Sequence, residues 1–270
     1  MFQVIAPCAA LAPYVNGYWF VEDLAGVYAG RRIVTCPYPG SVLSINFGRP
    51  NAMEGGPTVP QVSLLGFQST SRQWRSWPDT YFVMAMLSGA GLARLFPGIG
   101  PDCKDQLLDL AGYLGDGATH ALSADLSAAW TPARVACQLD AWLLRRMTAI
   151  RPAAELATIR AAHALLRQGR QVQEVASLTA VNRRQLNRWF ERHLGVGPKQ
   201  LMDLERLQSS IQAVQRGAGD ALSGYSDQPH QIRSWRRRLA QTPGDYARNG
   251  PSPLAEYFGR LPDDAPAFYL

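Results

Sequence analysis

A tandem repeat with a spacing of 45 residues is the feature that most restricts how this chain can fold. The first copy reads Arg188-Trp189-Phe190-Glu191-Arg192-His193-Leu194, followed by Pro198 and Leu201, and the second reads Arg233-Ser234-Trp235-Arg236-Arg237-Arg238-Leu239, followed by Pro243 and Tyr246. Each Arg, aromatic, Leu or Pro of the first copy lies 45 residues before its counterpart in the second copy. Because self-similarity at a fixed period is typical of repeated supersecondary units, the sequence predicts two tandem copies of one helical unit.

The first copy has the pattern of a helix-turn-helix. Val172, Val175 and Ala176 predict a short helix, residues 178–181 predict a turn, and Asn182 is a favourable N-cap for the next helix. In that helix, apolar residues recur every four positions and face inward, at Leu186, Phe190 and Leu194. The residues left on its outer face are Arg183, Arg184, Asn187, Arg188 and Glu191. Such a face offers hydrogen-bond donors to base edges in a major groove.

A third helix is predicted between the two copies. It begins at Pro198 and carries one apolar side, made of Leu201, Leu204, Leu207, Ile211 and Val214. A continuous helix here fixes the separation of the two units. We expect two recognition helices about 34 Å apart, which would enter successive major grooves on one face of DNA.

Positive charge is concentrated around the repeat. Residues 160–250 hold 15 Lys and Arg against 7 Asp and Glu, a net charge of +8 in a chain whose total is +6. All but one of those cations are Arg, the residue suited to bidentate contacts with phosphate and guanine. This indicates a polyanionic partner, although a solvated basic surface explains the charge, taken alone, equally well.

Two stretches of this region resemble the signatures of the AraC-type DNA-binding domain. They are Leu186-x-Arg188-x-Phe190-x-x-x-Leu194-Gly195-Val196-Gly197-Pro198-Lys199-Gln200 and Gly224-Tyr225-Ser226-Asp227-Gln228-Pro229-His230-x-Ile232-Arg233, and the resemblance covers residues 161–249. It implies a one-component regulator in which paired helix-turn-helix units bind promoter DNA. When the base-reading positions of the AraC-type domain are matched to this sequence, the resemblance implies that Arg184, Asn187 and Arg188 read bases in the first unit. In the second unit the matching residues are Gln228, His230 and Arg233.

The first 90 residues read as short strands broken by turns. Residues 15–21, 41–47, 61–67 and 80–87 are apolar or alternating, with Pro and Gly between them. This spacing favours a small sandwich or barrel. Residues from Tyr18 to Gly48 also resemble, more loosely, the cupin-like sensor domain of one AraC branch. Five aromatic residues could line an effector pocket or form the core: Trp19, Phe47, Trp74, Trp77 and Tyr81.

Helical periodicity replaces the strand pattern from about residue 91. Leu92, Leu95 and Phe96 predict a short helix that stops before Pro97, and an apolar stripe from Leu107 to Leu114 predicts another, ended by Gly115. A longer amphipathic helix is predicted over residues 135–147. Because no Lys or Arg lies between Gln106 and Pro132, we expect this region to pack on the strands and not to face DNA.

The predicted fold class is α+β, with a β-rich sensor or dimerisation domain over residues 1–90 and a helical connector over 91–158. The AraC-type DNA-binding domain follows over 159–250, and residues 251–270 form a C-terminal tail. We expect a cytoplasmic transcription activator, since no apolar run approaches the roughly 18 residues of a membrane span and no signal peptide is apparent. Expected partners are promoter DNA, a small-molecule effector, RNA polymerase and a second copy of the chain.

Two other classes of protein fit parts of the sequence. Some DNA-repair methyltransferases share this DNA-binding module, but the four cysteines here (Cys8, Cys36, Cys103 and Cys137) are scattered, and we expect four buried thiols. Only Cys103, beside Lys104, suggests a lowered thiol pKa. No metal or cofactor is expected, because residues 1–119 contain no histidine. The other alternative is an anti-activator or architectural protein whose N-terminal domain binds a protein.

The two units are predicted to be unequal. A shift of 45 residues places Gly217-Ala218-Gly219-Asp220 over the first helix of the first unit, Gln231 over Leu186, and Ala240 over Gly195. Each Gly costs about 1 kcal/mol in a helix, and a polar residue at a core position needs a hydrogen bond. Arg236, Arg237 and Arg238 still supply charge for phosphates. We therefore expect the second unit to add salt-sensitive affinity and little base discrimination.

Overall fold

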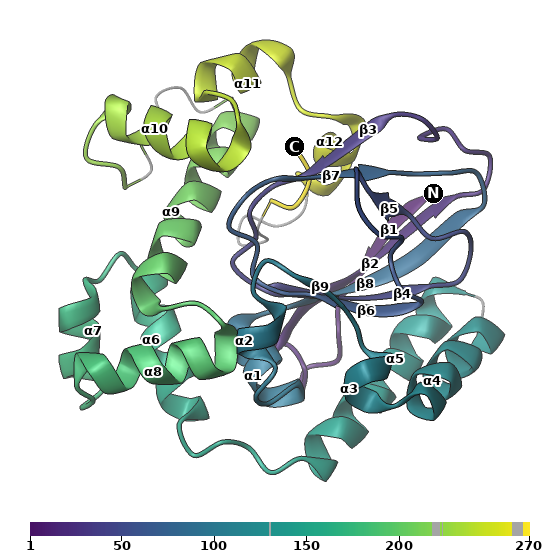
Figure 1. Ribbon diagram of the computed structural model, residues 1–270, viewed down its shortest axis with the longest axis horizontal. Helices are drawn as coiled ribbons and strands as arrows, with labels where there is room; N and C mark the ends of the chain where they lie inside the picture. The colour runs from purple at the N-terminus through teal and green to yellow at the C-terminus, as the bar shows by residue number, and fades with distance from the viewer. Residues whose placement is uncertain (130, 218–221, 223, 261–266) are drawn as a thin grey trace.

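The computed structural model describes residues 1–129, 131–217, 222, 224–260 and 267–270, and it has the predicted α+β fold (Figure 1). Strands make up the N-terminal part, and helices make up most of the remainder. In Figure 1 the sheets lie beside the long, vertical helix α9 (Pro198–Gln215), and the two helix-turn-helix units lie at its two ends. None of the described helices combines the length and the apolar character that crossing a bilayer requires.

The larger sheet is antiparallel and has six strands. In spatial order these are β1 (Phe2–Ile5), β2 (Val15–Asp23), β8 (Thr80–Leu87), β4 (Ser41–Asn46), β6 (Val62–Leu65) and β9 (Leu107–Asp109). Four of them, β2, β4, β6 and β8, lie where alternation and apolar runs predict strands. Both faces of this sheet are covered, so every residue of β8 is buried, whether it points to one face or to the other.

A smaller sheet packs over one face of the larger one. Its order is β3 (Arg32–Thr35), β7 (Arg72–Arg75) and β5 (Ala52–Met53). Alternate residues of the larger sheet, such as Val42 and Met84, point between the two sheets, whereas Leu43 and Val83 point to the opposite face, which the helices cover. The result is a two-sheet sandwich with two cores, one inside it and one beneath it.

Strand β9 corrects the prediction of a helix from Leu107 to Leu114. Leu107 and Leu108 pair with Leu65 and Leu64 of β6, and only Ala111–Leu114 is helical (α3). The i, i+3, i+4, i+7 spacing of apolar residues agrees with a helix, but β6 would otherwise leave an unpaired sheet edge. Pairing this edge with residues 107–109 satisfies its backbone groups.

Helices cover the outer face of the larger sheet. They are α1 (Gly89–Leu95), α2 (Gly100–Cys103), α3, α4 (Asp116–Ala129) and α5 (Pro132–Ala149). Ser88 and Thr131 cap α1 and α5 through their side-chain oxygens. In Figure 1 these helices lie below the sheets. One continuous apolar core joins them to the sheet and to the first helix-turn-helix unit.

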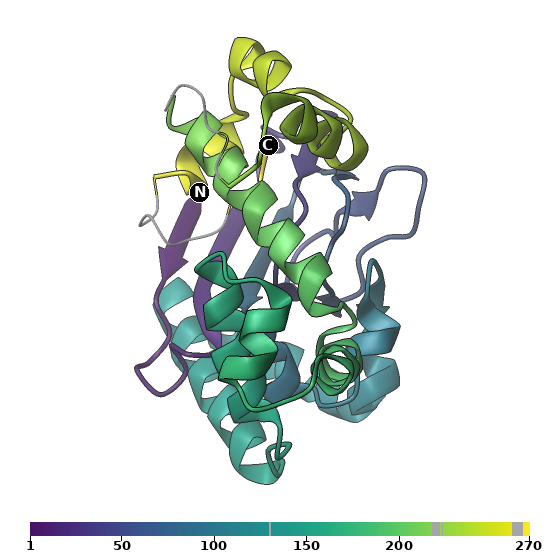
Figure 2. The same ribbon diagram turned by 90° about the vertical axis from the view of Figure 1, so that its left-hand side faces the viewer.

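The helices of the C-terminal part reproduce the repeat. They are α6 (Leu156–Arg167), α7 (Val172–Leu178), α8 (Arg183–Leu194), α9 (Pro198–Gln215), α10 (Gln228–Leu239) and α11 (Pro243–Asn249). The bounds of α8 and α10 differ by 45 residues at both ends, and so do the starts of α9 and α11. Both views show α8 and α10 held near opposite ends of α9 (Figures 1 and 2). At 1.5 Å per residue, α9 is about 27 Å long.

The C-terminal segment returns to the N-terminal sheets. After α12 (Pro253–Phe258), the backbone of Tyr269 bridges Thr35 of β3, and Leu270 donates a backbone hydrogen bond to Val34. Phe268 and Tyr269 are buried in the core between the sheets, while Leu270 is buried in a third core with Trp235 of α10. This segment therefore touches both the sandwich and the second helix-turn-helix unit.

Candidate DNA-binding surface and ligand cavity

The first unit presents α8 as its recognition helix. The side chain of Asn182 accepts a hydrogen bond from the backbone N–H of Gln185 at 2.8 Å, which fixes where the helix begins. Leu186, Phe190 and Leu194 are completely buried, as their spacing predicts. At the other end, Gly195 has a φ of 74° and packs so closely on Gly100 that any side chain would collide with the carbonyl of that residue.

The predicted DNA-binding residues of this helix share one exposed groove. Its lining consists of Arg183, Arg184, Asn187 and Arg188, together with Val172, Glu191 and Lys199. Arg188 donates a hydrogen bond to the side chain of Gln185 one turn earlier, at 2.5 Å. Four cations and one amide therefore converge on a surface that is open to solvent. Lys199, on the first turn of α9, adds a positive charge and is not among the DNA-binding residues predicted from the sequence.

The second unit presents a matching but sparser face. Asp227 caps α10 by accepting a hydrogen bond from the backbone N–H of His230 at 2.7 Å, a bond that lowers the pKa of the Asp227 carboxyl. Gln228 and Arg233 are exposed, and His230 is half-buried against the ring of Tyr225. At the positions of Arg184 and Asn187 this helix has Pro229 and Ile232, so it offers fewer hydrogen-bond donors.

Arg238 is not available to phosphates, contrary to the prediction from its charge. Its side chain is 9% exposed and donates to the carbonyl of Ser69 at 2.9 Å, and its own carbonyl accepts from the N–H of Ser71. Burial lowers the pKa of its guanidinium. The repeat explains the error, because position 238 corresponds to His193, which faces inward in the first unit. Arg236 and Arg237 are exposed.

The structure shows how the second unit accommodates two of the other differences, at positions 231 and 240. Gln231 is buried in place of Leu186 and finds the hydrogen bond that such a position requires, donating to the hydroxyl of Ser210 at 2.9 Å. Ala240 keeps the left-handed backbone of Gly195, with a φ of 56°, a conformation that costs an L-residue about 1–2 kcal/mol. The predicted short helix around residues 217–220 lies mostly outside the described residues.

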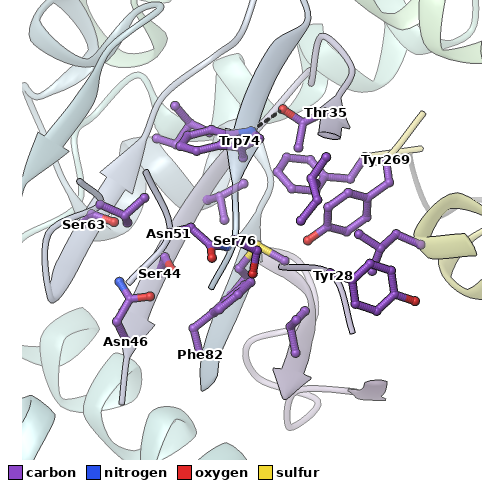
Figure 3. Close-up of a pocket in the computed structure, with 18 of the residues that line it drawn as sticks. Tyr28, Thr35, Ser44, Asn46, Asn51, Ser63, Trp74, Ser76, Phe82 and Tyr269 are labelled. Carbon is purple, nitrogen blue, oxygen red and sulfur yellow. Dashed lines mark hydrogen bonds between the residues drawn. The ribbon is translucent and has the colours of Figure 1, made fainter. Parts of the chain in front are cut away.

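A cavity lies between the two sheets of the sandwich (Figure 3). It is narrow, with a free volume of about 70 Å³, and it opens to solvent at one side. Most of the lining is apolar, with Trp74 held in place by a hydrogen bond from its Nε1–H to Thr35 at 3.0 Å. Its walls come from both sheets and from the C-terminal segment, through Leu254, Phe268 and Tyr269.

The five aromatic residues predicted for an effector pocket are not brought together. Trp74 lines the cavity, but Trp19 is stacked on Phe258 of α12, with ring centroids 4.3 Å apart. Phe47 and Tyr81 contact each other on the helix-covered side of the sheet, and Trp77 lies under the guanidinium of Arg49. Strand parity separates Tyr81 from the cavity, since neighbours in a strand point to opposite faces, whereas Trp19 lies on the cavity side but against α12. The same parity identifies lining residues that were missed: Ser44, Asn46, Ser63, Phe82 and Met84.

The cysteines differ from expectation in their exposure. Cys36 and Cys103 are buried, Cys8 is half-buried and Cys137 is exposed, so the prediction of four buried thiols holds for only two. Burial raises the thiol pKa of Cys36 and of Cys103 to about 12. This overturns the suggestion that Lys104 activates Cys103. Within the described ranges, no group of three or more His, Cys, Asp or Glu side chains is arranged to hold a metal ion.

Residues 175–249 match a protein-family model described as a helix-turn-helix domain. No curated protein is significantly similar to this chain in sequence. Among solved structures, ToxT from Vibrio cholerae O395 is similar, with 9% identity, a TM-score of 0.44, and coverage of 86% of this chain and 95% of that one. Wild-type ToxT of strain SCE256 with bound unsaturated fatty acid is 12% identical, with a TM-score of 0.42 and coverage of 85% and 93%.

Proposed function

We propose that this protein is a one-component transcription regulator of the AraC type that binds specific double-stranded DNA sequences, because residues 175–249 match a helix-turn-helix family model and contain two stretches that resemble the AraC-type signatures. The observation that carries the proposal is the shared groove on α8, where Arg184, Asn187 and Arg188 lie exposed beside Lys199. In this function the arginines read guanine edges, the amide reads adenine, and the lysine contacts a phosphate. RNA polymerase and a second copy of the chain are proposed as partners on the family resemblance.

We further propose that the cavity between the sheets is the effector site of the regulator. Two observations support this proposal: the position of the cavity between the two sheets and its mixed lining of apolar walls and a few polar side chains. Tryptophan fluorescence would report occupancy, because Trp74 lines the cavity. The proposed activity is control of transcription and not catalysis.

The test compares Arg188→Ala with Arg145→Ala, which removes an equally charged, exposed arginine from α5. Operators are first obtained by genome-wide mapping of bound sites, and affinities are then measured on operator variants at several salt concentrations. Loss of a bidentate base contact worth about 1–3 kcal/mol should weaken specific binding about 5- to 150-fold and relax sequence preference. Non-specific binding should change little, and all binding should fall steeply with salt. Unchanged affinity and preference in Arg188→Ala would refute the assignment of α8.

A further inference from the structure

The cavity between the sheets contains a buried hydroxyl that has no hydrogen-bond partner. Ser63 on β6 lines the cavity, is completely buried, and its Oγ contacts no donor or acceptor in the described part of the chain. An unsatisfied buried hydroxyl is unfavourable by about 1–3 kcal/mol, so a molecule in the cavity that hydrogen-bonds with it gains that stabilisation.

Further polar groups lie beside this hydroxyl. Ser44 is the direct cross-strand partner of Ser63, and Asn46 follows two positions later on the same face of β4. The amide of Asn46 donates to the carbonyl of Pro60 at 2.8 Å, which fixes the orientation of its side chain. Figure 3 shows these three residues along one side of the cavity, with Tyr28 and Tyr269 on the opposite side.

The charge of the lining disfavours an anionic ligand and offers a cationic one a single carboxylate that is already hydrogen-bonded. No described lining residue is Lys, Arg or His, and the segments outside the description contain none in their sequence. The one carboxylate, Asp23, accepts hydrogen bonds from the backbone N–H groups of Val27 and Tyr28 at 2.7 and 2.8 Å. A ligand carboxylate would enter without a counter-charge and near this anion. A ligand cation would have to share the Asp23 oxygens with these two backbone donors, which weakens the pairing that a buried charge requires.

We propose that this cavity binds an uncharged, largely apolar molecule whose single hydroxyl, carbonyl or amide group hydrogen-bonds with Ser63. The rest of the molecule lies against Trp74, Phe82 and Met84. The proposal rests on the proposed effector function of the N-terminal domain and specifies the chemical class of the effector.

Three probes of one chain length separate the possibilities: n-octanol, octanoate and octylammonium, titrated at pH 7 into the full chain. Binding is followed by tryptophan fluorescence and by the shift in melting temperature. We expect n-octanol to bind at least about tenfold more tightly than either ion, because burying an unpaired charge is costly. Equal or tighter binding of octanoate or octylammonium, or no binding of n-octanol, would overturn the proposal.

Ser63→Ala tests the hydrogen bond, with Ser41→Ala as the matched control. Ser41 is also completely buried with an unpartnered Oγ, but it lies on the face of β4 that points away from the cavity. We expect Ser63→Ala to weaken n-octanol binding about 3- to 10-fold and Ser41→Ala to leave it unchanged, with both variants folded by their melting curves. Equal effects of the two variants would refute the role of Ser63. Operator binding is measured in a separate experiment. A negative result for n-octanol therefore does not test the proposed DNA-binding function, which the Arg188→Ala variant tests.

Discussion

Ser210 is the residue on which the packing of the second recognition helix depends. It is completely buried on α9, and its hydroxyl accepts hydrogen bonds from Gln231 and from the indole of Trp235, both at 2.9 Å. We predict that Ser210→Ala lowers the free energy of unfolding by about 1–3 kcal/mol, because two buried donors lose an acceptor. The neighbouring Ser209→Ala, on the exposed side of α9, should change it by less than about 0.5 kcal/mol. Denaturant unfolding of both variants measures the difference, and similar losses would contradict this account.

Glu155 joins α6 to the recognition helix of the first unit and should make stability depend on pH. Its Oε1 lies 2.8 Å from Nε2 of His193, and this hydrogen bond lowers the pKa of the Glu155 carboxyl from its ordinary value of 4.5. The unfolded chain therefore takes up this proton at a higher pH than the folded chain does. The stabilisation is complete above pH 4.5 and is lost as the pH falls through the lower, folded pKa.

We predict that Glu155→Gln reduces the acid-induced loss of stability. The free energy of unfolding of the parent chain should decline more steeply between about pH 5 and pH 3 than that of the variant, because the variant has no proton to take up at this position. Urea unfolding at a series of pH values gives both slopes. Parallel curves would show that the hydrogen bond with His193 does not contribute to acid sensitivity.

At the level of single residues, the sequence predicts helix positions well and strand positions less well. A spacing of four assigns Leu186, Phe190 and Leu194 to the core and leaves Arg184 and Arg188 exposed, as observed. For Arg238, charge predicts a phosphate contact, whereas the repeat aligns it with the buried His193, and the side chain is buried. In the strands, aromatic character does not identify the face. Trp74 and Tyr81 were predicted together and lie on opposite sides of the sheet, since orientation depends on the strand register.

The two recognition helices are the elements whose roles should differ most. Helices α8 and α10 have equal length and corresponding caps, but the face of α10 has Pro229 and Ile232 where α8 has Arg184 and Asn187. We predict that Arg188→Ala relaxes sequence preference much more than Arg233→Ala does. Arg233→Ala should mainly weaken binding uniformly across operator variants and reduce the slope of its salt dependence. Equal losses of preference on a panel of operator variants would show that the second unit also reads bases.

Elements were predictable where local signals were strong. The repeat, the caps and the apolar spacing predict α8 and α9 closely, and alternation predicts the long strands β2, β4 and β8. The short strands β3, β5, β7 and β9 exist because of partners distant in sequence. Leu107–Asp109, for example, is a strand because β6 presents an edge to it. Hydrophobic periodicity within such short segments contains no information about those partners.

In the molecule as a whole, Leu270 joins the strand sandwich to the C-terminal helices. It packs with Trp235 of the second unit and Ile211 of α9, and its backbone N–H donates to Val34 of β3. We predict that Leu270→Ala lowers the free energy of unfolding by about 2–5 kcal/mol. Leu178→Ala is the control. Because Leu178 is 60% exposed, its replacement should lower the free energy of unfolding by less than about 0.5 kcal/mol. Thermal or denaturant unfolding of both variants measures these losses, and a loss for Leu270→Ala as small as that for Leu178→Ala would contradict a structural role of Leu270.

The return of the C-terminal segment to the sandwich also sets an order of events during synthesis on the ribosome. Cys36 donates to the carbonyl of Ala267, a contact between residues 231 positions apart. A nascent chain that has made both sheets still has an open cavity, because Phe268 and Tyr269 are translated after the recognition helices. A polypeptide that stops before residue 268 would therefore lack one wall of the cavity, although both recognition helices would already have been made. The cavity thus gains its complete lining only when the helices that follow the sandwich in sequence have already been synthesised.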